Sequence, residues 1–176
     1  GGNAATVGGG QSNTADSIAA TVGGGYDNSA GGTNATVAGG YRNTVSADSA
    51  VVGGGYVNTA SGYTATVGGG QYNIAGGIAA TASGGYSNTV SADYAAVSGG
   101  QYNSASAGYA AVGGGHLNTA SGHNATVGGG QLNVAGGLAA TASGGYSNTV
   151  SADYAAAGGG YSNTASDVAA TVAGGY

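Results

Sequence analysis

Residues 53–67 read GGGYVNTASGYTATV, and looser copies of this stretch stand at 68–82 (GGGQYNIAGGIAATA) and at 113–127 (GGGHLNTASGHNATV). Pairs of glycines recur at a constant 15-residue interval, twelve times, from 9–10 to 174–175, and no insertion interrupts them. A unit this short cannot hold the helical hairpin of common α-repeats, whose period is roughly 33–47 residues. The period therefore predicts a β-solenoid in which each repeat unit forms one coil.

Within each coil, alternation with a period of two predicts two short strands. In one strand Ala65 and Val67 share a face, in the other Asn58 and Ala60 share a face, and the threonines between them point the opposite way. Glycines at 53–55 and around 62 are expected to form the turns, because glycine adopts positive φ at little cost. The predicted fold is an all-β parallel β-solenoid, or β-roll, with residues 1–176 as a single array of nearly twelve coils.

One asparagine per coil falls on the inward register, three residues after each glycine pair except the last. Stacked asparagine amides can hydrogen-bond along a ladder, or they can pair with backbone groups of the turns, where a buried unpaired amide costs about 1–3 kcal/mol. We therefore expect a buried structural ladder rather than an exposed ligand-binding strip. Its members are Asn13, Asn28, Asn43, Asn58, Asn73, Asn88, Asn103, Asn118, Asn133, Asn148 and Asn163.

The composition restricts the classes of function. The 42 glycines would favour disorder, but the strict period and the low charge favour a folded chain. Arg42 is the only basic residue against six aspartates, which disfavours nucleic acid and anionic membrane surfaces as partners. No apolar run approaches the roughly 20 residues of a transmembrane helix. The sequence starts within a repeat, so we expect a segment of a longer protein. A stable solenoid without disulfides would suit an extracellular or cell-surface location, which is the location we expect.

Candidate catalytic chemistry is scarce. His116 and His123 are the only imidazoles, and we expect them at exposed turn positions rather than in a metal pair. Asp48, Asp93 and Asp153 follow Val-Ser-Ala in three coils, where aspartate commonly caps a turn through its own side chain. They are too isolated for a carboxylate pair or a calcium site. We therefore predict no catalytic, cofactor or metal site and no enzymatic activity.

Tyrosine and aliphatic side chains at the variable positions form a candidate contact surface. Tyrosine is enriched at protein interfaces, and exposed apolar stripes often mark a partner. The aliphatic members recur once in every four coils. The candidate surface consists of Tyr26, Tyr41, Tyr56, Tyr86, Tyr146, Tyr161, Ile18, Ile78 and Leu138. We expect this surface to bind further copies of the chain, as a homotrimer or filament, or a ligand on a host or other surface.

The repeat A-x-V-x-G-x-x-x-N-x-A-x-G-x-x resembles the head repeat of trimeric autotransporter adhesins, the YadA-like or Hep/Hag repeat. Ala65, Val67 and Gly54 supply the corresponding kinds of residue in one half of the unit, and Asn58, Ala60 and Gly62 supply those in the other. The unit is one residue longer than is usual in that family, and asparagine stands where the family often has serine. The resemblance covers the whole chain and implies a left-handed β-roll, three chains around one axis and attachment at a bacterial surface. Trimeric phage-type fibres have similar repeats.

Two functions stay open. The first is a structural or adhesive extracellular fibre segment. The second is ice binding through outward hydroxyl columns, which Ile74/Gly76 and Val134/Gly136 interrupt. The columns are Thr44/Ser46, Thr59/Ser61, Thr89/Ser91, Thr119/Ser121, Thr149/Ser151 and Thr164/Ser166.

Overall fold

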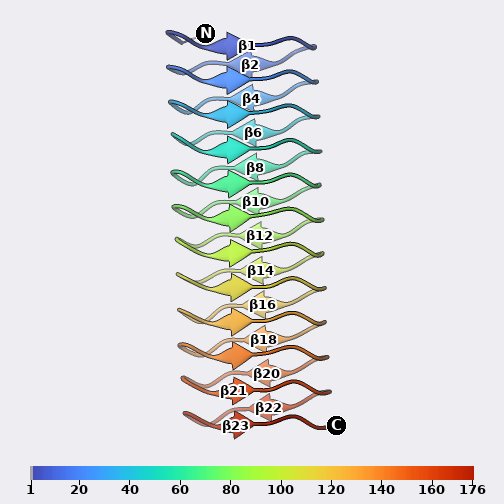
Figure 1. The fold of residues 1–176 in the computed structure, drawn as a ribbon. Coiled ribbons are helices and arrows are strands. Elements are labelled where there is room, and N and C mark those ends of the chain that lie inside the picture. Colours follow the sequence, from blue (N-terminus) through green and yellow to red (C-terminus); the bar gives the residue numbers. More distant parts are fainter. Residues whose placement is uncertain (1) are drawn as a thin grey trace.

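The computed structural model describes residues 2–176 as a straight stack of similar coils with the two termini at opposite ends (Figure 1). Each coil contributes one two-residue strand to each of two sheets, and the described residues contain no helix. In particular, residues 2–176 contain no helix that is long and apolar enough to cross a membrane. The predicted all-β parallel solenoid, with one coil per repeat unit, is confirmed.

Within residues 2–176, one sheet has twelve strands and the other has eleven. The odd-numbered strands form the twelve-stranded sheet: β1 (Thr6–Val7), β3 (Thr21–Val22), β5 (Thr36–Val37), β7 (Val51–Val52), β9 (Thr66–Val67), β11 (Thr81–Ala82), β13 (Ala96–Val97), β15 (Ala111–Val112), β17 (Thr126–Val127), β19 (Thr141–Ala142), β21 (Ala156–Ala157) and β23 (Thr171–Val172). The even-numbered strands form the eleven-stranded sheet: β2 (Thr14–Ala15), β4 (Ser29–Ala30), β6 (Thr44–Val45), β8 (Thr59–Ala60), β10 (Ile74–Ala75), β12 (Thr89–Val90), β14 (Ser104–Ala105), β16 (Thr119–Ala120), β18 (Val134–Ala135), β20 (Thr149–Val150) and β22 (Thr164–Ala165).

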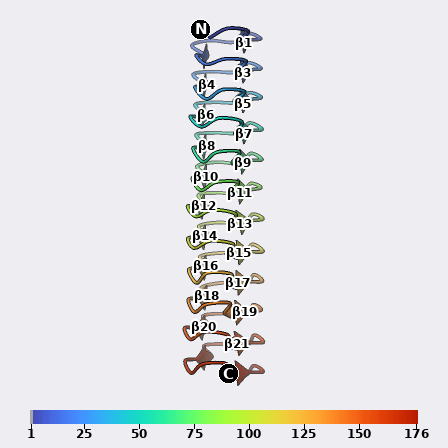
Figure 2. The same cartoon turned by 90° about the vertical axis from the view of Figure 1, so that its left-hand side faces the viewer.

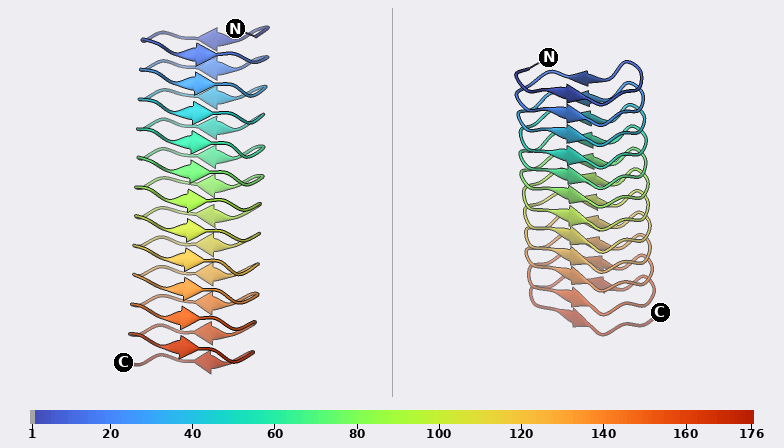
Figure 3. Two further views of the ribbon diagram at one scale, coloured as in Figure 1. Left: turned by 180° about the vertical axis from the view of Figure 1, so that it is seen from behind. Right: turned by 45° about the horizontal axis from the view of Figure 1, so that its top comes forward.

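All strand pairs are parallel, and each residue pairs with the residue one coil further on, as Val52 does with Val67. In Figure 1 the front strands run to the right and the rear strands run to the left while the chain descends from its N-terminus. The reverse view in Figure 3 shows the same sense, so the solenoid winds left-handed. This is the hand that the resemblance implied, and it is opposite to the hand of most parallel crossover connections.

The core is a thin slot filled by alanine and valine between the two sheets, which face each other in Figure 2. Ala65 and Val67 from one sheet and Ala60 from the other are 0 % exposed, whereas Thr59 and Thr66 lie on the outer faces. The register predicted from alternation is therefore correct. Small side chains permit this because they bring the two backbones close together without voids.

A third line of parallel bridges connects the coils outside the named strands. It runs through the column that begins at Gln11 and includes Tyr26, Tyr41 and Tyr56, and it ends at Tyr161. The backbone N–H of Tyr56 donates to the carbonyl oxygen of Gly70 in the next coil at 2.9 Å. The strand alternation did not predict this line, because each bridge is a single residue that directly follows the turn glycines.

The turns differ from the sequence expectation at one position. Gly55 has a φ of 94°, as expected, but Gly62 is not in the positive-φ region. At that second turn the positive φ falls instead on Thr64, at 56°, and each coil places a non-glycine residue in this column. Gly62 has a different role: a Cβ there would overlap the backbone of Gly77 in the next coil. The glycine thus provides close approach between coils rather than chain reversal.

Candidate functional site

The asparagine column lies inside the solenoid and joins consecutive coils. Nine of its members, from Asn28 to Asn148, are at most 1 % exposed, while Asn13 and Asn163 near the two ends are half-buried. The Asn58 Nδ2 group donates to the carbonyl oxygens of Gly54 and Gly70, both at 2.9 Å, and its Oδ1 accepts from the backbone N–H of Asn73 at 2.9 Å. Each side chain therefore bonds mainly to backbone groups and connects the turn of its own coil to the turn of the next coil. We call this arrangement the asparagine clamp.

Tyrosines directly follow the turn glycines in many coils and line one edge of the rod. We call this edge the aromatic edge. The rings of Tyr26, Tyr41 and Tyr56 stack with centroid separations of 5.2 and 4.9 Å and interplanar angles of 10° and 5°. Tyr146 and Tyr161 stack in the same way, at 5.0 Å. Parallel stacking follows from the register, because equivalent positions in adjacent coils lie about 4.8 Å apart. The ring faces are thus covered by their neighbours, and the ring edges and hydroxyls remain exposed.

At Gln71 and Gln101, two of the four glutamines in the column, a tyrosine at the next position fills the gap in the aromatic edge. Tyr72 follows Gln71 and packs against Tyr56 and Tyr86 at 5.4 and 5.6 Å, with ring planes 75° apart in both pairs. Tyr102 follows Gln101 and does the same between Tyr86 and His116. The aromatic series is therefore continuous from Tyr26 to His116. The Gln-Tyr dipeptides at 71–72 and 101–102 are the sequence signal that a tyrosine replaces the missing ring. Comparing each repeat position separately does not reveal it, because the glutamine and the tyrosine occupy different positions.

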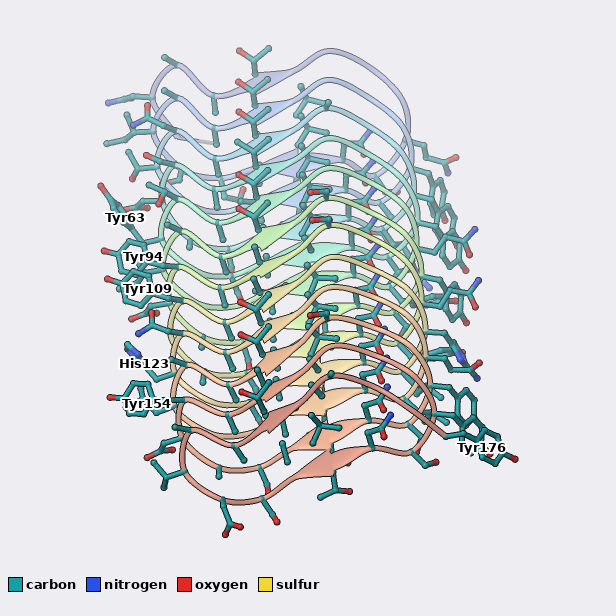
Figure 4. The ribbon with its side chains drawn as sticks, turned by 60° about the horizontal axis from the view of Figure 1, so that its bottom comes forward. Tyr63, Tyr94, Tyr109, His123, Tyr154 and Tyr176 are labelled. Atoms are coloured by element: carbon teal, nitrogen blue, oxygen red, sulfur yellow. The ribbon has the colours of Figure 1, made fainter. Side chains whose placement is uncertain are left out.

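A second exposed row lies on the opposite edge of the rod, as the labelled residues in Figure 4 show. We call it the opposite edge. It consists of Ile18, Tyr63, Ile78, Tyr94, Tyr109, His123, Leu138, Tyr154 and Val168. Tyr94 and Tyr109 stack at 5.0 Å, and Tyr109 contacts His123 at 5.5 Å.

The candidate contact surface is therefore divided between two edges. Its six tyrosines belong to the aromatic edge, whereas Ile18, Ile78 and Leu138 belong to the opposite edge. Each of the three aliphatic residues shares a column with polar residues such as Asp48, so they do not form an unbroken apolar stripe. Ile18 and Ile78 are exposed and Leu138 is half-buried. One partner lying against a single side of the rod cannot cover the whole set.

Three aspartates cap turns, but the turn that each one caps belongs to the preceding coil. The Oδ1 atom of Asp93 accepts from the backbone N–H of Ile78 at 2.8 Å, and Asp153 accepts from Leu138 at 2.8 Å. Asp48 accepts from Thr33 at 2.7 Å. The expectation that these side chains cap turns is confirmed, and the capped N–H group lies in the preceding coil because stacking brings each carboxylate over it.

The two histidines lie at opposite edges and do not approach each other. His116 is half-buried on the aromatic edge, where its Nδ1 lies 3.3 Å from Nε2 of Gln131. His123 is exposed on the opposite edge, where its Nδ1 lies 2.9 Å from Nδ2 of Asn124. Residues 2–176 form no pocket, and no three metal-ligating side chains gather within that range.

Local interactions adjust the few ionisable groups on the aromatic edge. The pKa of Tyr72 is raised mainly by a hydrogen bond to Tyr56 and to a smaller extent by desolvation. The pKa of Tyr102 is raised in the same way, mainly by a hydrogen bond to Tyr86. Arg42 pairs with Asp27 at 2.9 Å and lies 5.6 Å from the ring centroid of Tyr41. Both charged side chains are well exposed, so this pair contributes little to stability.

The outer faces of both sheets carry hydroxyl groups. On the eleven-stranded sheet the predicted Thr/Ser pairs lie in register, with Ile74 and Val134 as the interruptions in the first column. The twelve-stranded sheet has a second column, which was not among the predicted hydroxyl columns. It contains Thr6, Thr21, Thr36, Thr66, Thr81, Thr126, Thr141 and Thr171, and aliphatic residues occupy the remaining coils.

Comparison with protein-family models gives no match for this chain, and comparison with the curated proteins gives none either. The resemblance to trimeric adhesin heads therefore stays a prediction drawn from the repeat residues.

Proposed function

We propose that this chain is a rigid structural segment of an extracellular fibre, which displays a repetitive surface for attachment or filament assembly. The observation that carries the proposal is the strict equivalence of successive coils. Each coil presents the same backbone hydrogen-bonding groups to the next, and each buries its small core residues only where it has a neighbour. Val22 is 0 % exposed in an interior coil, whereas its equivalent Val7 near the N-terminal end is 46 % exposed.

The two exposed edges supply surfaces for association between rods. Aromatic and aliphatic side chains enriched at interfaces gather on both edges, and only Arg42 and six aspartates provide charge that would keep copies apart. Edges on opposite sides of one rod favour open side-by-side assembly, because a head-to-tail contact that does not close extends into a filament. A closed homotrimer, which the adhesin resemblance implies, would use adjacent sides instead.

Analytical ultracentrifugation of the purified chain tests this proposal. We expect species larger than the 15.9 kDa monomer, with a proportion that rises with concentration. Ile78→Lys on the opposite edge should reduce association, because it places a charge in the contact. Thr89→Lys on the outer face of β12 is the matched control and should leave association unchanged. A monomer at every concentration would contradict the fibre proposal.

Ice binding is the second candidate, and the in-register hydroxyl column of the eleven-stranded sheet favours it. A flat array of alternating methyl and hydroxyl groups can order water over a large area. Thermal hysteresis of the purified chain is the measurement. If this face binds ice, Thr119→Tyr in β16 should reduce the hysteresis by disturbing the flat array, and His123→Tyr on the opposite edge should not. An absence of hysteresis would exclude this candidate.

A further inference from the structure

Tyr94 and Tyr109 form an exposed stacked pair between adjacent coils. They occupy the same repeat position in consecutive units, and their ring planes differ by 9°. Each is 53 % exposed, and Figure 4 shows both rings pointing away from the rod with their hydroxyls outermost. The aromatic edge repeats this geometry in Tyr26–Tyr41, Tyr41–Tyr56, Tyr146–Tyr161 and Tyr161–Tyr176.

We propose that these stacked tyrosine pairs are sites of oxidative cross-linking, at which a carbon–carbon bond between two phenol rings fastens one coil to the next. The parallel register places two equivalent rings side by side. Their hydroxyls and the ring carbons next to them lie near each other at the exposed edge. Two reacting groups held in this way meet without diffusing, which strongly favours reaction within the pair over reaction between molecules.

The reaction balances with hydrogen peroxide and a haem peroxidase as the oxidising system. Each phenol loses one electron and one proton and becomes a phenoxyl radical. The two radicals form one bond between the Cε carbons, and the hydrogen on each of those carbons then moves to the oxygen and restores the phenol. Hydrogen peroxide takes up the two electrons and two protons and becomes two molecules of water.

A bond between equivalent residues of adjacent coils would stabilise the solenoid in the way that a disulfide closing a short loop stabilises a protein. It restricts the unfolded chain by closing a loop and leaves the folded backbone in place. It also prevents the joined coils from separating at an edge of the stack. This inference does not depend on the fibre proposal, because it concerns a bond within one chain.

Tyr154 provides a matched control within the same chain. It occupies the repeat position of Tyr94 and follows the same residues, Ser-Ala-Asp. It is 61 % exposed. Its neighbours in the column are Ala139 and Ala169, so among residues 2–176 it has no stacked ring. If stacking rather than exposure controls the reaction, Tyr94 and Tyr109 should couple within one chain and Tyr154 should not.

The experiment treats dilute purified chain with a haem peroxidase and hydrogen peroxide. It measures dityrosine fluorescence, migration on denaturing gels and the cross-linked peptides by mass spectrometry. We expect monomeric protein that has lost two hydrogens per bond, and a peptide in which residue 94 is joined to residue 109. Tyr109→Phe should abolish that peptide, whereas Tyr154→Phe should leave it unchanged. Both variants keep the ring, and circular dichroism checks that both remain folded.

Two results would overturn the proposal. One is cross-linking only between chains, with a yield that depends on concentration and with Tyr154 as reactive as Tyr94. The other is an absence of cross-linked protein while a free tyrosine peptide in the same reaction is coupled. If the expected peptide forms, the cross-linked chain should also melt at a higher temperature than untreated protein.

Discussion

At the scale of single residues, the asparagine side chain connects each coil to the next through hydrogen bonds to backbone groups. Asn88 donates to the carbonyl oxygens of Gly84 and Gly100 at 2.9 Å each, and its Oδ1 accepts from the backbone N–H of Asn103 at 2.9 Å. All three partners are backbone groups, and the Gly100 carbonyl oxygen also accepts from the backbone N–H of Tyr86 at 2.9 Å. No buried side-chain nitrogen or oxygen in residues 2–176 lacks a hydrogen-bond partner, so the polar groups of the core are fully satisfied.

Replacing Asn88 by leucine should destabilise the solenoid strongly. The change leaves backbone groups unpaired at about 1–3 kcal/mol each and puts a bulkier side chain into the thin slot. We therefore expect a loss of about 3 kcal/mol or more, measured by thermal and urea denaturation followed by circular dichroism. Thr89→Val, one residue away on the outer face, should change stability by less than about 0.5 kcal/mol. Equal melting of the two variants would show that the ladder contributes nothing.

A second feature at the residue scale is backbone strain at non-glycine positions. Thr64 has a φ of 56° and Val57 a φ of 54°, although both are β-branched. A left-handed conformation costs such residues roughly 1–2 kcal/mol each. Asparagine tolerates this conformation better, and the chain itself places Asn34 and Asn124 at the position equivalent to Thr64.

Thr64→Asn should therefore stabilise the protein by about 1 kcal/mol, because it relieves this strain. Thr66→Asn is the matched control: it lies in β9, where asparagine is unfavourable, and it should lower stability slightly. Urea denaturation of both variants beside the original protein gives the comparison. A loss of stability on Thr64→Asn would mean that the Thr64 Oγ1 bond to the Tyr63 carbonyl oxygen, at 2.7 Å, outweighs the strain.

At the scale of the element, the coil depends on one glycine column that meets two demands at once. Gly55 combines a φ of 94° with a site where a Cβ would overlap the carbonyl oxygen of Gly70 and lie 2.6 Å from Nδ2 of Asn58. The Gly55 carbonyl oxygen also accepts from Tyr41 N–H and Asn43 Nδ2, both at 2.9 Å. The turn, the asparagine clamp and the third line of bridges therefore meet at this residue.

Gly55→Ala should lower stability by about 3 kcal/mol or more, because the alanine combines an unfavourable φ with a backbone overlap. Gly76→Ala is the matched control, because it makes the same substitution at a glycine to which neither reason applies. Gly76 is not in the positive-φ region, and a Cβ there would come no closer than 3.7 Å to another atom, so the change should be neutral or stabilising by up to about 1 kcal/mol. Urea denaturation distinguishes the two. A mild effect at Gly55 would show that the coil spacing can expand locally.

At the scale of the whole molecule, the solenoid is a one-dimensional array in which each coil contacts only its neighbours. Stability in such an array is a sum of coil and interface terms. The terminal coils have one neighbour each, and this is reflected in the core column, where Val7 is 46 % exposed and Val172 is partly exposed. Local opening from the ends is therefore expected before the central coils unfold cooperatively.

Amide hydrogen exchange followed by mass spectrometry should report this gradient. Peptides that contain β1, β2, β22 or β23 should exchange first, and peptides around β12 should exchange last, because a central coil opens only after its neighbours. The Gly55→Ala variant should create a third fast region around β7–β9 while the centre near β16 stays protected. Uniform exchange along the chain would contradict stepwise opening from the ends.

The sequence by itself determined the coil length, the two strands per coil, the inward register of alanine, valine and asparagine, and the outward register of threonine. The repeat period and the two-residue alternation are local patterns, and a core that admits only small side chains leaves one register that buries them. The tyrosine column was also readable, because equivalent positions stack in any parallel solenoid. Of the two histidines expected at exposed turns, only His123 lies at one, whereas His116 is half-buried in the column of parallel bridges.

Only the tertiary structure decided which side chains and backbone groups make contact between adjacent coils. It showed that the asparagine side chain bonds to backbone groups of its own coil and of the next coil, that Asp93 caps the turn of the preceding coil, and that positive φ falls on Thr64 while Gly62 provides close approach. It also separated the predicted contact set into two edges and placed Tyr72 in the gap left by Gln71. These contacts join residues of adjacent coils through turns, and their geometry depends on how the turns orient each side chain. Periodicity reports which residues recur, whereas the direction of a side chain leaving a turn is set by backbone angles that appear only when the coils are stacked.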